Sequence, residues 1–260
     1  MVSAPALVLV AHGTRSPRGV EMIGTLADAV RAELAASDVH GAAQHPPTCR
    51  STSSGPTMFT EPQVRTAFVD VLGPTPAEVL GDLNGAPAVV VPAFLASGYH
   101  VYQDVPREVR DSGHPDVVVT PAMGPDRMLA RVMRMRLREA GMRRGDAVVL
   151  AAAGSSDARA RHDVRRATAL LAEELGGAVR TAYIATGEPR VPEVVAALRE
   201  SGQQRVFVGS YLLAHGLFHQ RLHEAGADGV AEPLGAHPAV VRLLIDRYRT
   251  AAREFLVTAA

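Results

Sequence analysis

LVLVAHGTRSPRGVEMIGTLADAVRAEL at residues 7–34 and VVLAAAGSSDARARHDVRRATALLAEEL at residues 148–175 are two versions of one segment, 141 positions apart. In each version a short apolar run leads into apolar residues at helical spacing, the pattern of a buried strand followed by a helix. Internal similarity of this length predicts two related αβ units. The versions differ at one reactive position, where His12 of the first aligns with Ala153 of the second.

A second pair of segments repeats this asymmetry. TAFVDVLGP, which starts at Thr66, corresponds to TAYIATGEP, which starts at Thr181. In this pair Asp70 of the first version aligns with Ala185 of the second. Because the reactive side chains are kept in only one copy, the repeat predicts an active half and a supporting half.

The distribution of apolar runs predicts the fold class. RRGD at residues 143–146 separates the repeats, so we expect an N-terminal half at residues 1–143 that carries the active site and a degenerate half at residues 144–260. Strands rich in Val and Leu, with little polar alternation, are typical of a parallel sheet covered on both faces. We therefore expect an α/β protein of two homologous halves, each a small parallel sheet flanked by helices. Strands are expected at 6–11, 65–71, 88–92, 117–120, 147–151, 179–184, 205–208 and 229–231, and helices at 17–36, 76–83, 101–111, 125–140, 158–175, 191–200, 217–225 and 238–255.

The composition excludes several classes of function. With 27 basic against 27 acidic residues, the chain has no general field that attracts nucleic acid or an anionic membrane. Every basic residue is Arg, so carboxylate ligands must be bound by guanidinium or backbone N–H groups, and Schiff-base chemistry is excluded. No apolar run approaches the roughly 18 residues of a membrane span, and Met1–Ala11 lacks the charged start of a signal peptide. The single cysteine, Cys49, fits a reducing compartment, and we expect a cytoplasmic monomer or homodimer.

The stretch HGAAQHPPTCRSTSSGPTMFTEPQ, residues 40–63, interrupts the first half. It is rich in Pro, Ser, Thr and Gly and has few apolar side chains to bury, which is typical of a long surface loop or disordered insertion. Its His45 and Cys49 are spaced like a pair of metal ligands, but no further ligands accompany them. We interpret the stretch as a passive loop, with a cover over the active site as the alternative.

Three reactive side chains stand just after predicted strands of the first half. His12 and Gly13 follow the first strand, Asp70 ends the second, and His100 follows the third. Ligands bind beyond the carboxyl ends of parallel strands, where these side chains are expected to meet. Two imidazoles and a carboxylate suit a divalent ion such as Fe²⁺, Co²⁺, Ni²⁺ or Zn²⁺. Neutral imidazole also accepts protons near neutral pH.

The segments VAHGTRSPRG, AFVD and VPAFLASGYHVYQDVP resemble the sirohydrochlorin chelatases, the metal-inserting enzymes of sirohaem and cobalamin synthesis. The resemblance extends over nearly the whole chain except the insertion. It implies the class II chelatase fold of two αβ halves, a reaction without nucleotide, and no prosthetic group. It also implies that His12 and His100 bind the metal and handle protons, with Asp70 as an acidic helper. The family usually has Glu at this last position, so direct metal coordination by the shorter Asp stays open.

The resemblance implies two substrates, the tetrapyrrole sirohydrochlorin and a divalent metal ion. Our first expectation is insertion of Fe²⁺ to give sirohaem. Insertion of Co²⁺ in cobalamin synthesis is the alternative, because the same ligands suit both ions. A non-catalytic carrier of tetrapyrrole or metal is the alternative from another class. The candidate contacts for the substrate are Gly13, Thr14, Arg15, Arg18, Ser97, Gly98, Tyr99 and Arg107, through side chains or through free N–H groups near helix starts.

A further group of histidines lies in the second half. His215, His219 and His223 are spaced by four residues, which places them on one face of a helix. The Glu that follows the first His in the zinc-protease motif is missing. We therefore predict a helix without metal, and a storage or delivery role if metal binds there.

Overall fold

The computed structural model describes residues 4–14, 16–41 and 62–258. His45, Cys49 and most of the predicted insertion lie outside the described residues. The first half contains β1 (Ala6–Ala11), α1 (Pro17–Gly41), β2 (Val64–Phe68), α2 (Pro76–Gly81), β3 (Ala88–Pro92), the π-helix η1 (His100–Asp104), α3 (Val105–Asp111), β4 (Val117–Val119) and α4 (Arg127–Glu139). The second half contains β5 (Ala147–Gly154), α5 (Ala158–Leu175), β6 (Val179–Thr186), α6 (Val191–Glu200), β7 (Val206–Tyr211), α7 (Leu217–His223), β8 (Gly229–Val230) and α8 (Pro238–Thr258).

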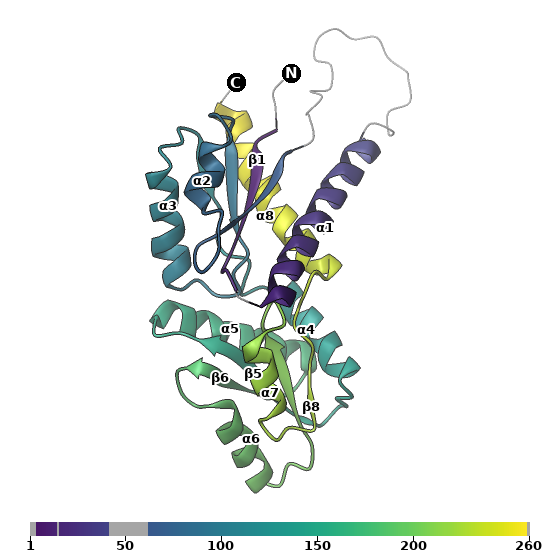
Figure 1. Ribbon diagram of the computed structural model, residues 1–260. Coiled ribbons are helices and arrows are strands. Elements are labelled where there is room, and N and C mark those ends of the chain that lie inside the picture. The colour runs from purple at the N-terminus through teal and green to yellow at the C-terminus, as the bar shows by residue number, and fades with distance from the viewer. Residues whose placement is uncertain (1–3, 15, 42–61, 259–260) are drawn as a thin grey trace, which may run out of the picture.

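The strands form two separate parallel sheets, one in each half (Figure 1). The first sheet has the order β2-β1-β3-β4, and the second has the equivalent order β6-β5-β7-β8. In the first sheet Leu7 is paired with Val64 on one side and with Val89 on the other. The predicted α/β class with two small parallel sheets is confirmed.

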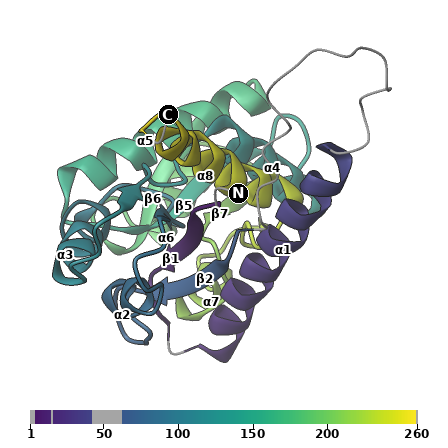
Figure 2. The same ribbon diagram turned by 90° about the horizontal axis from the view of Figure 1, so that it is seen from above.

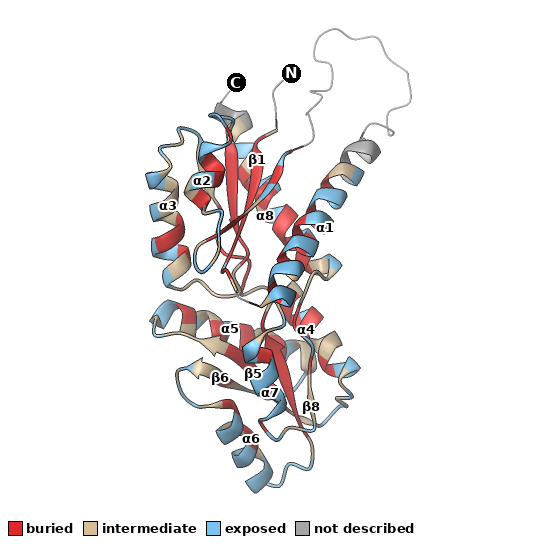
Figure 3. Ribbon diagram, in the orientation of Figure 1, coloured by how far each residue is buried: buried red, intermediate tan, exposed pale blue. Residues whose placement is uncertain are grey.

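Helices cover both faces of each sheet, which is why β1, β3 and β7 are buried along their whole length and β5 is buried along most of it (Figure 3). Side chains of α2 and α3 pack on one face of the first sheet, and those of α6 and α7 pack on one face of the second. The remaining faces belong to one continuous core that joins the two halves and contains Leu7, Leu26, Val89, Met133, Leu150, Leu171, Phe207 and Leu244. Burial of continuous apolar runs on both faces explains the lack of polar alternation in these strands.

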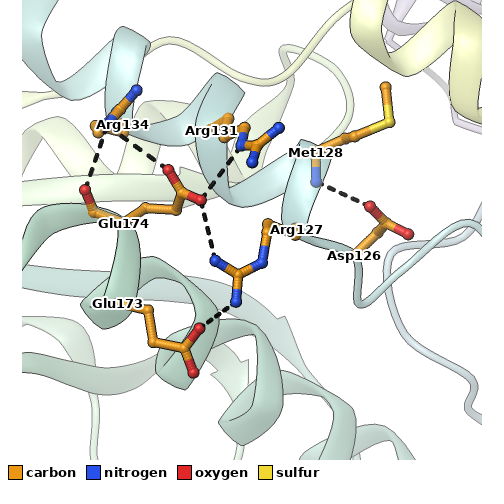
Figure 4. A network of polar contacts seen from close by, with 7 residues as sticks. All are labelled: Asp126, Arg127, Met128, Arg131, Arg134, Glu173 and Glu174. Carbon is orange, nitrogen blue, oxygen red and sulfur yellow. Dashed lines mark hydrogen bonds and ion pairs between the residues drawn. The ribbon is translucent and has the colours of Figure 1, made fainter.

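Two helices pack across the boundary between the sequence repeats. The last helix of the first half, α4, lies against α5 and β7, whereas the C-terminal helix α8 lies against α1 and β3 (Figures 1 and 2). Arg127, Arg131 and Arg134 of α4 form ion pairs with Glu174 of α5 (Figure 4). The side chain of Glu174 is only 9% exposed, so these three contacts offset its desolvation. The division at residues 143 and 144 therefore marks the sequence repeat, while packing crosses it.

Several boundaries differ from the predicted ones. β2 ends at Phe68 and not at Val71, because Leu72 N–H bonds to the Asp70 carbonyl at 2.8 Å in a tight turn. β7 continues past Val208 to Tyr211. Its Gly and Ser look like a strand end in sequence, yet the glycine at 209 lets α4 approach closely and the serine at 210 bonds to a backbone carbonyl. In the described part of the chain, no helix has both the length and the apolar character needed to cross a membrane.

Candidate active site

The first sheet has its topological switch point between β1 and β3. The chain leaves β1 to pair on one side through β2 and returns to pair on the other side through β3. Crevices that bind ligands form at such points, beyond the carboxyl ends of the strands. His12 directly follows β1, and His100 begins η1 after the loop that leaves β3. The fold thus brings the two predicted histidines together in one crevice.

The two imidazole rings lie together. The ring centroids of His12 and His100 are 4.6 Å apart, with an angle of 32° between the planes. Phe94 also stacks with His100, with ring centroids 6.1 Å apart. Gly13 makes this arrangement possible, because an ideal Cβ there would lie 1.8 Å from the Asp70 carbonyl oxygen.

A buried carboxylate fixes the orientation of His100. Its Nδ1 lies 2.7 Å from Asp104 Oδ2, and Asp104 is only 6% exposed. The second carboxylate oxygen pairs with Arg107 Nη2 at 3.0 Å. An ionised carboxylate only accepts hydrogen bonds, so this contact favours the neutral tautomer of His100 that has its proton on Nδ1 and its lone pair on Nε2. This is the arrangement in which a carboxylate orients a histidine that binds metal.

The surroundings of His12 keep its ring neutral. Its pKa is lowered from the usual value, first because protein around the ring displaces water and second because His100 would repel a positive charge. Asp70 and Asp104 act in the opposite direction and raise the pKa of His12. A neutral imidazole can bind a metal ion or accept a proton.

Asp70 lies near this pair without joining it as a third ligand. The residue is exposed, and its Oδ1 accepts a hydrogen bond from Val71 N–H at 2.8 Å. Val71 has a φ of 67°, which an exposed β-branched residue rarely adopts. The described residues contain no group of three or more His, Cys, Asp or Glu placed to hold a metal ion. The geometry provides a pair of imidazoles with a carboxylate beside it.

Both halves line the cleft in front of the histidines. It has a volume of about 540 Å³, and its walls include His12, Tyr99 and His100 from the first half and Ala153 and Phe218 from the second. A cavity of about 650 Å³ lies at the opposite end of the second sheet and contains none of the predicted site residues. The cleft between the halves is therefore the candidate active site.

The structure corrects the expectation of free backbone N–H groups at the loop after β3. Ser97 N–H donates to Asp163 Oδ2 at 2.8 Å, and Gly98 N–H donates to the Ala96 carbonyl at 3.2 Å. These donors are already used within the protein, because Asp163 reaches across from α5 of the other half. Of this predicted group, Gly98 and Tyr99 line the cleft.

The other described side chains predicted to contact the substrate are either bonded within the protein or exposed. Thr14 Oγ1 accepts a hydrogen bond from Ser16 N–H at 3.2 Å, just before α1 begins. Arg107 binds Asp104, while Arg18 is exposed. Arg15 lies outside the described residues. Contacts between these side chains and the substrate carboxylates therefore stay a prediction.

The predicted helix carries only two of the three histidines, because α7 begins at Leu217 and His215 precedes it. The rings of His215, His219 and His223 nevertheless form a row. His215 Nε2 contacts Glu232 Oε2 at 2.5 Å. His219 is buried, and its Nε2 lies 3.2 Å from the Ala231 carbonyl oxygen. The rings of neighbouring members are edge-to-face, with centroids 5.0 Å and 4.9 Å apart. That this helix acts without metal stays a prediction.

Sequence reasoning missed Asp104. The signal was present, because His100 and Asp104 are four residues apart at the start of a predicted helix, and residues at this spacing share a face. It also missed the contribution of Phe218, because sequence alone does not show which segments form the opposite wall of the cleft.

Comparisons with known proteins agree with this geometry. A model of the CbiX family matches residues 52–140 and 147–251, one segment in each half. A sirohydrochlorin ferrochelatase of Priestia megaterium is 26% identical over 178 residues, which span 62% of this chain and 66% of that protein, just under two thirds of its length. The solved structure of SirB from Bacillus subtilis with Fe³⁺ has a TM-score of 0.76 at 21% identity and covers 97% of this chain and 96% of its own. The sirohydrochlorin chelatase SirB from Bacillus subtilis subspecies spizizenii, in complex with cobalt, has a TM-score of 0.70 at 21% identity with the same coverage of 97% and 96%. At these identities the solved structures show that the fold is shared.

Proposed function

The chain belongs to the CbiX family, and from this we propose that it is a sirohydrochlorin chelatase that inserts Fe²⁺ to form sirohaem without nucleotide. The observation that carries the proposal is the contact between His12 and His100, whose ring centroids are 4.6 Å apart. Both rings line a cleft between the two αβ halves. Both substrates, the metal ion and the tetrapyrrole, would meet in this cleft.

The reaction has modest chemical requirements. One divalent ion replaces two protons on the pyrrole nitrogens, so the protein must loosen the ion's hydration shell, bring it to the ring and accept protons. A site with many strong ligands would retain the ion. Two imidazoles suit Fe²⁺ and Co²⁺ and leave coordination positions for the ring nitrogens.

The contacts of the two histidines suggest different roles. We assign the metal to His100, because Asp104 fixes its ring and leaves Nε2 available. We assign proton acceptance to His12, because its lowered pKa keeps it neutral near pH 7. Asp70 raises the pKa of His12, and so it favours the protonated ring once a proton has been taken. We therefore assign Asp70 the role of a helper and not that of a required metal ligand.

Iron is our first choice of metal because the curated relative is named a ferrochelatase. Cobalt is the second candidate, since a similar fold has been solved with cobalt and the ligand types do not separate the two ions. Insertion rates measured with Fe²⁺ and with Co²⁺ will decide between the two metals.

The test is anaerobic incubation of the protein with sirohydrochlorin and Fe²⁺, Co²⁺ or Ni²⁺, followed by the absorbance change of the tetrapyrrole. We expect faster insertion than in matched mixtures without protein, and the highest rate with Fe²⁺. A higher rate with Co²⁺ would favour the cobalt alternative. Tight binding of the tetrapyrrole without acceleration by any metal would overturn the proposal in favour of a carrier.

A further inference from the structure

The second half contains an altered copy of the active site. Its sheet has the equivalent strand order, with the switch point between β5 and β7. Ala153 lies in β5 at the position equivalent to His12, and Phe218 follows β7 at the position equivalent to His100. The backbone also repeats, because an ideal Cβ on Gly154 would lie 1.9 Å from the Thr186 carbonyl oxygen. Ala153 and Phe218 line the same cleft as the two histidines.

Apolar side chains remain exposed around this cleft. Phe218 is 37% exposed, although Phe is among the residue types that are most often buried. Of the exposed large hydrophobic residues in the described part of the chain, Tyr99 and Phe218 line the cleft. Exposed apolar groups gathered in one place are typical of a binding site.

Two arginines accompany Phe218: Arg161 lines the cleft, and Arg221 lies beside the Phe218 ring without lining the cleft. The Arg221 guanidinium lies 6.0 Å from the centre of the Phe218 ring. Arg161 lines the cleft and donates to the backbone carbonyls of Ser155 and Ser156. Within the described residues, neither arginine forms an ion pair with a carboxylate. A flat apolar ring with carboxylates at its edge matches this combination of an aromatic face and guanidinium groups that have no carboxylate partner among the described residues.

We propose that the altered copy of the site is a binding subsite for the tetrapyrrole, in which Phe218 stacks on the macrocycle and Arg221 contacts its carboxylates. This inference rests on the proposed function, since it takes the same tetrapyrrole as the ligand of the cleft. The second half has lost the histidines that bind metal and supplies the surface that binds the ring. The two substrates are thereby divided between the two copies.

The test measures binding of metal-free sirohydrochlorin by quenching of its fluorescence, so it does not depend on turnover. Phe218→Ala should raise the tetrapyrrole Kd about tenfold, because stacking on an aromatic ring is worth about that factor. Phe218→Leu should give a smaller loss. Leu217→Ala is the matched control, because Leu217 is the preceding residue of α7, is 59% exposed and does not line the cleft. Co²⁺ binding by each variant checks that the histidine pair is intact.

The contribution of charge is tested separately. Arg221→Gln should raise the Kd about threefold at low salt, an effect that should shrink at high salt because the side chain is exposed. Arg144→Gln, at an exposed position lining the cavity at the opposite end of the second sheet, is its control. Wild-type binding with an unchanged Kd in Phe218→Ala would overturn the subsite and leave the proposed function standing. Absence of binding by the wild type would overturn both.

Discussion

Substitution of Asp104 by Asn tests whether the orientation of His100 matters for metal handling. Asn has nearly the same shape as Asp, but it lacks the charge and its amide can turn to present N–H groups to Nδ1. Such a turn would place the proton on Nε2, where the metal is expected. We predict that Asp104→Asn lowers Co²⁺ affinity and the rate of metal insertion together.

The size of the effect follows from the burial of the pair. The Nδ1 to Oδ2 distance is 2.7 Å and the Asp104 side chain is only 9% exposed, so water screens this contact poorly. Loss of such an outer-shell contact costs about 10- to 100-fold in metal affinity, or about 1.4–2.7 kcal/mol. Arg107 is half exposed and can be hydrated after the change, so we expect a small effect on unfolding.

A double-mutant cycle separates orientation from general damage. Co²⁺ affinity is measured by titration of the cobalt absorption spectrum for the wild type, Asp104→Asn, His100→Ala and the double variant. If Asp104 acts through His100, its substitution should cost little once His100 is absent. An equal loss in both backgrounds, or an Asp104→Asn variant within twofold of the wild type, would refute the reasoning.

Three further predictions concern other parts of the chain. His215→Ala should keep most of the insertion activity, whereas His219→Ala should lower the thermal midpoint, because His219 is buried and bonds to a backbone carbonyl; loss of metal insertion by folded His215→Ala would contradict the site. The insertion rate should fall in acid, and because the pKa of His12 is lowered its protonation should come below the usual value of about 6.5; a profile flat down to about pH 5 would exclude neutral imidazole as the active form. Replacing residues 42–60 by a short Gly/Ser linker should shift the thermal midpoint by only a few degrees, or about 0.5 kcal/mol, and a folded variant with little remaining activity would disprove the passive loop.

Much of the fold was predictable because its signals are local. The apolar runs of β1 and β3 are unbroken, and the repeat indicates which segments are equivalent. What the pattern does not give is the partner of each buried face. The periodicity of α4 does not indicate that this helix packs on the second sheet. Likewise, the periodicity of α8 does not indicate that it packs on the first sheet.

The candidate site was predictable where residues follow strand ends. The contact between His12 and His100 follows from adjacent parallel strands, which are fixed by topology. The roles of Ser97 and Asp163 were not predictable, because their hydrogen bond joins residues 66 positions apart from different halves. Contacts of this kind depend on how the halves pack, which no local pattern records.

In the proposed mechanism, His12 and His100 together carry out metal insertion. Its most direct test is the anaerobic insertion rate at limiting Fe²⁺, measured for the wild type and for His12→Ala and His100→Ala. We predict that each substitution lowers the rate by about 10²–10⁴ while the fold persists, because His12 is exposed and His100 is partly exposed beyond strand ends. Rates close to that of the wild type in both variants would contradict the account.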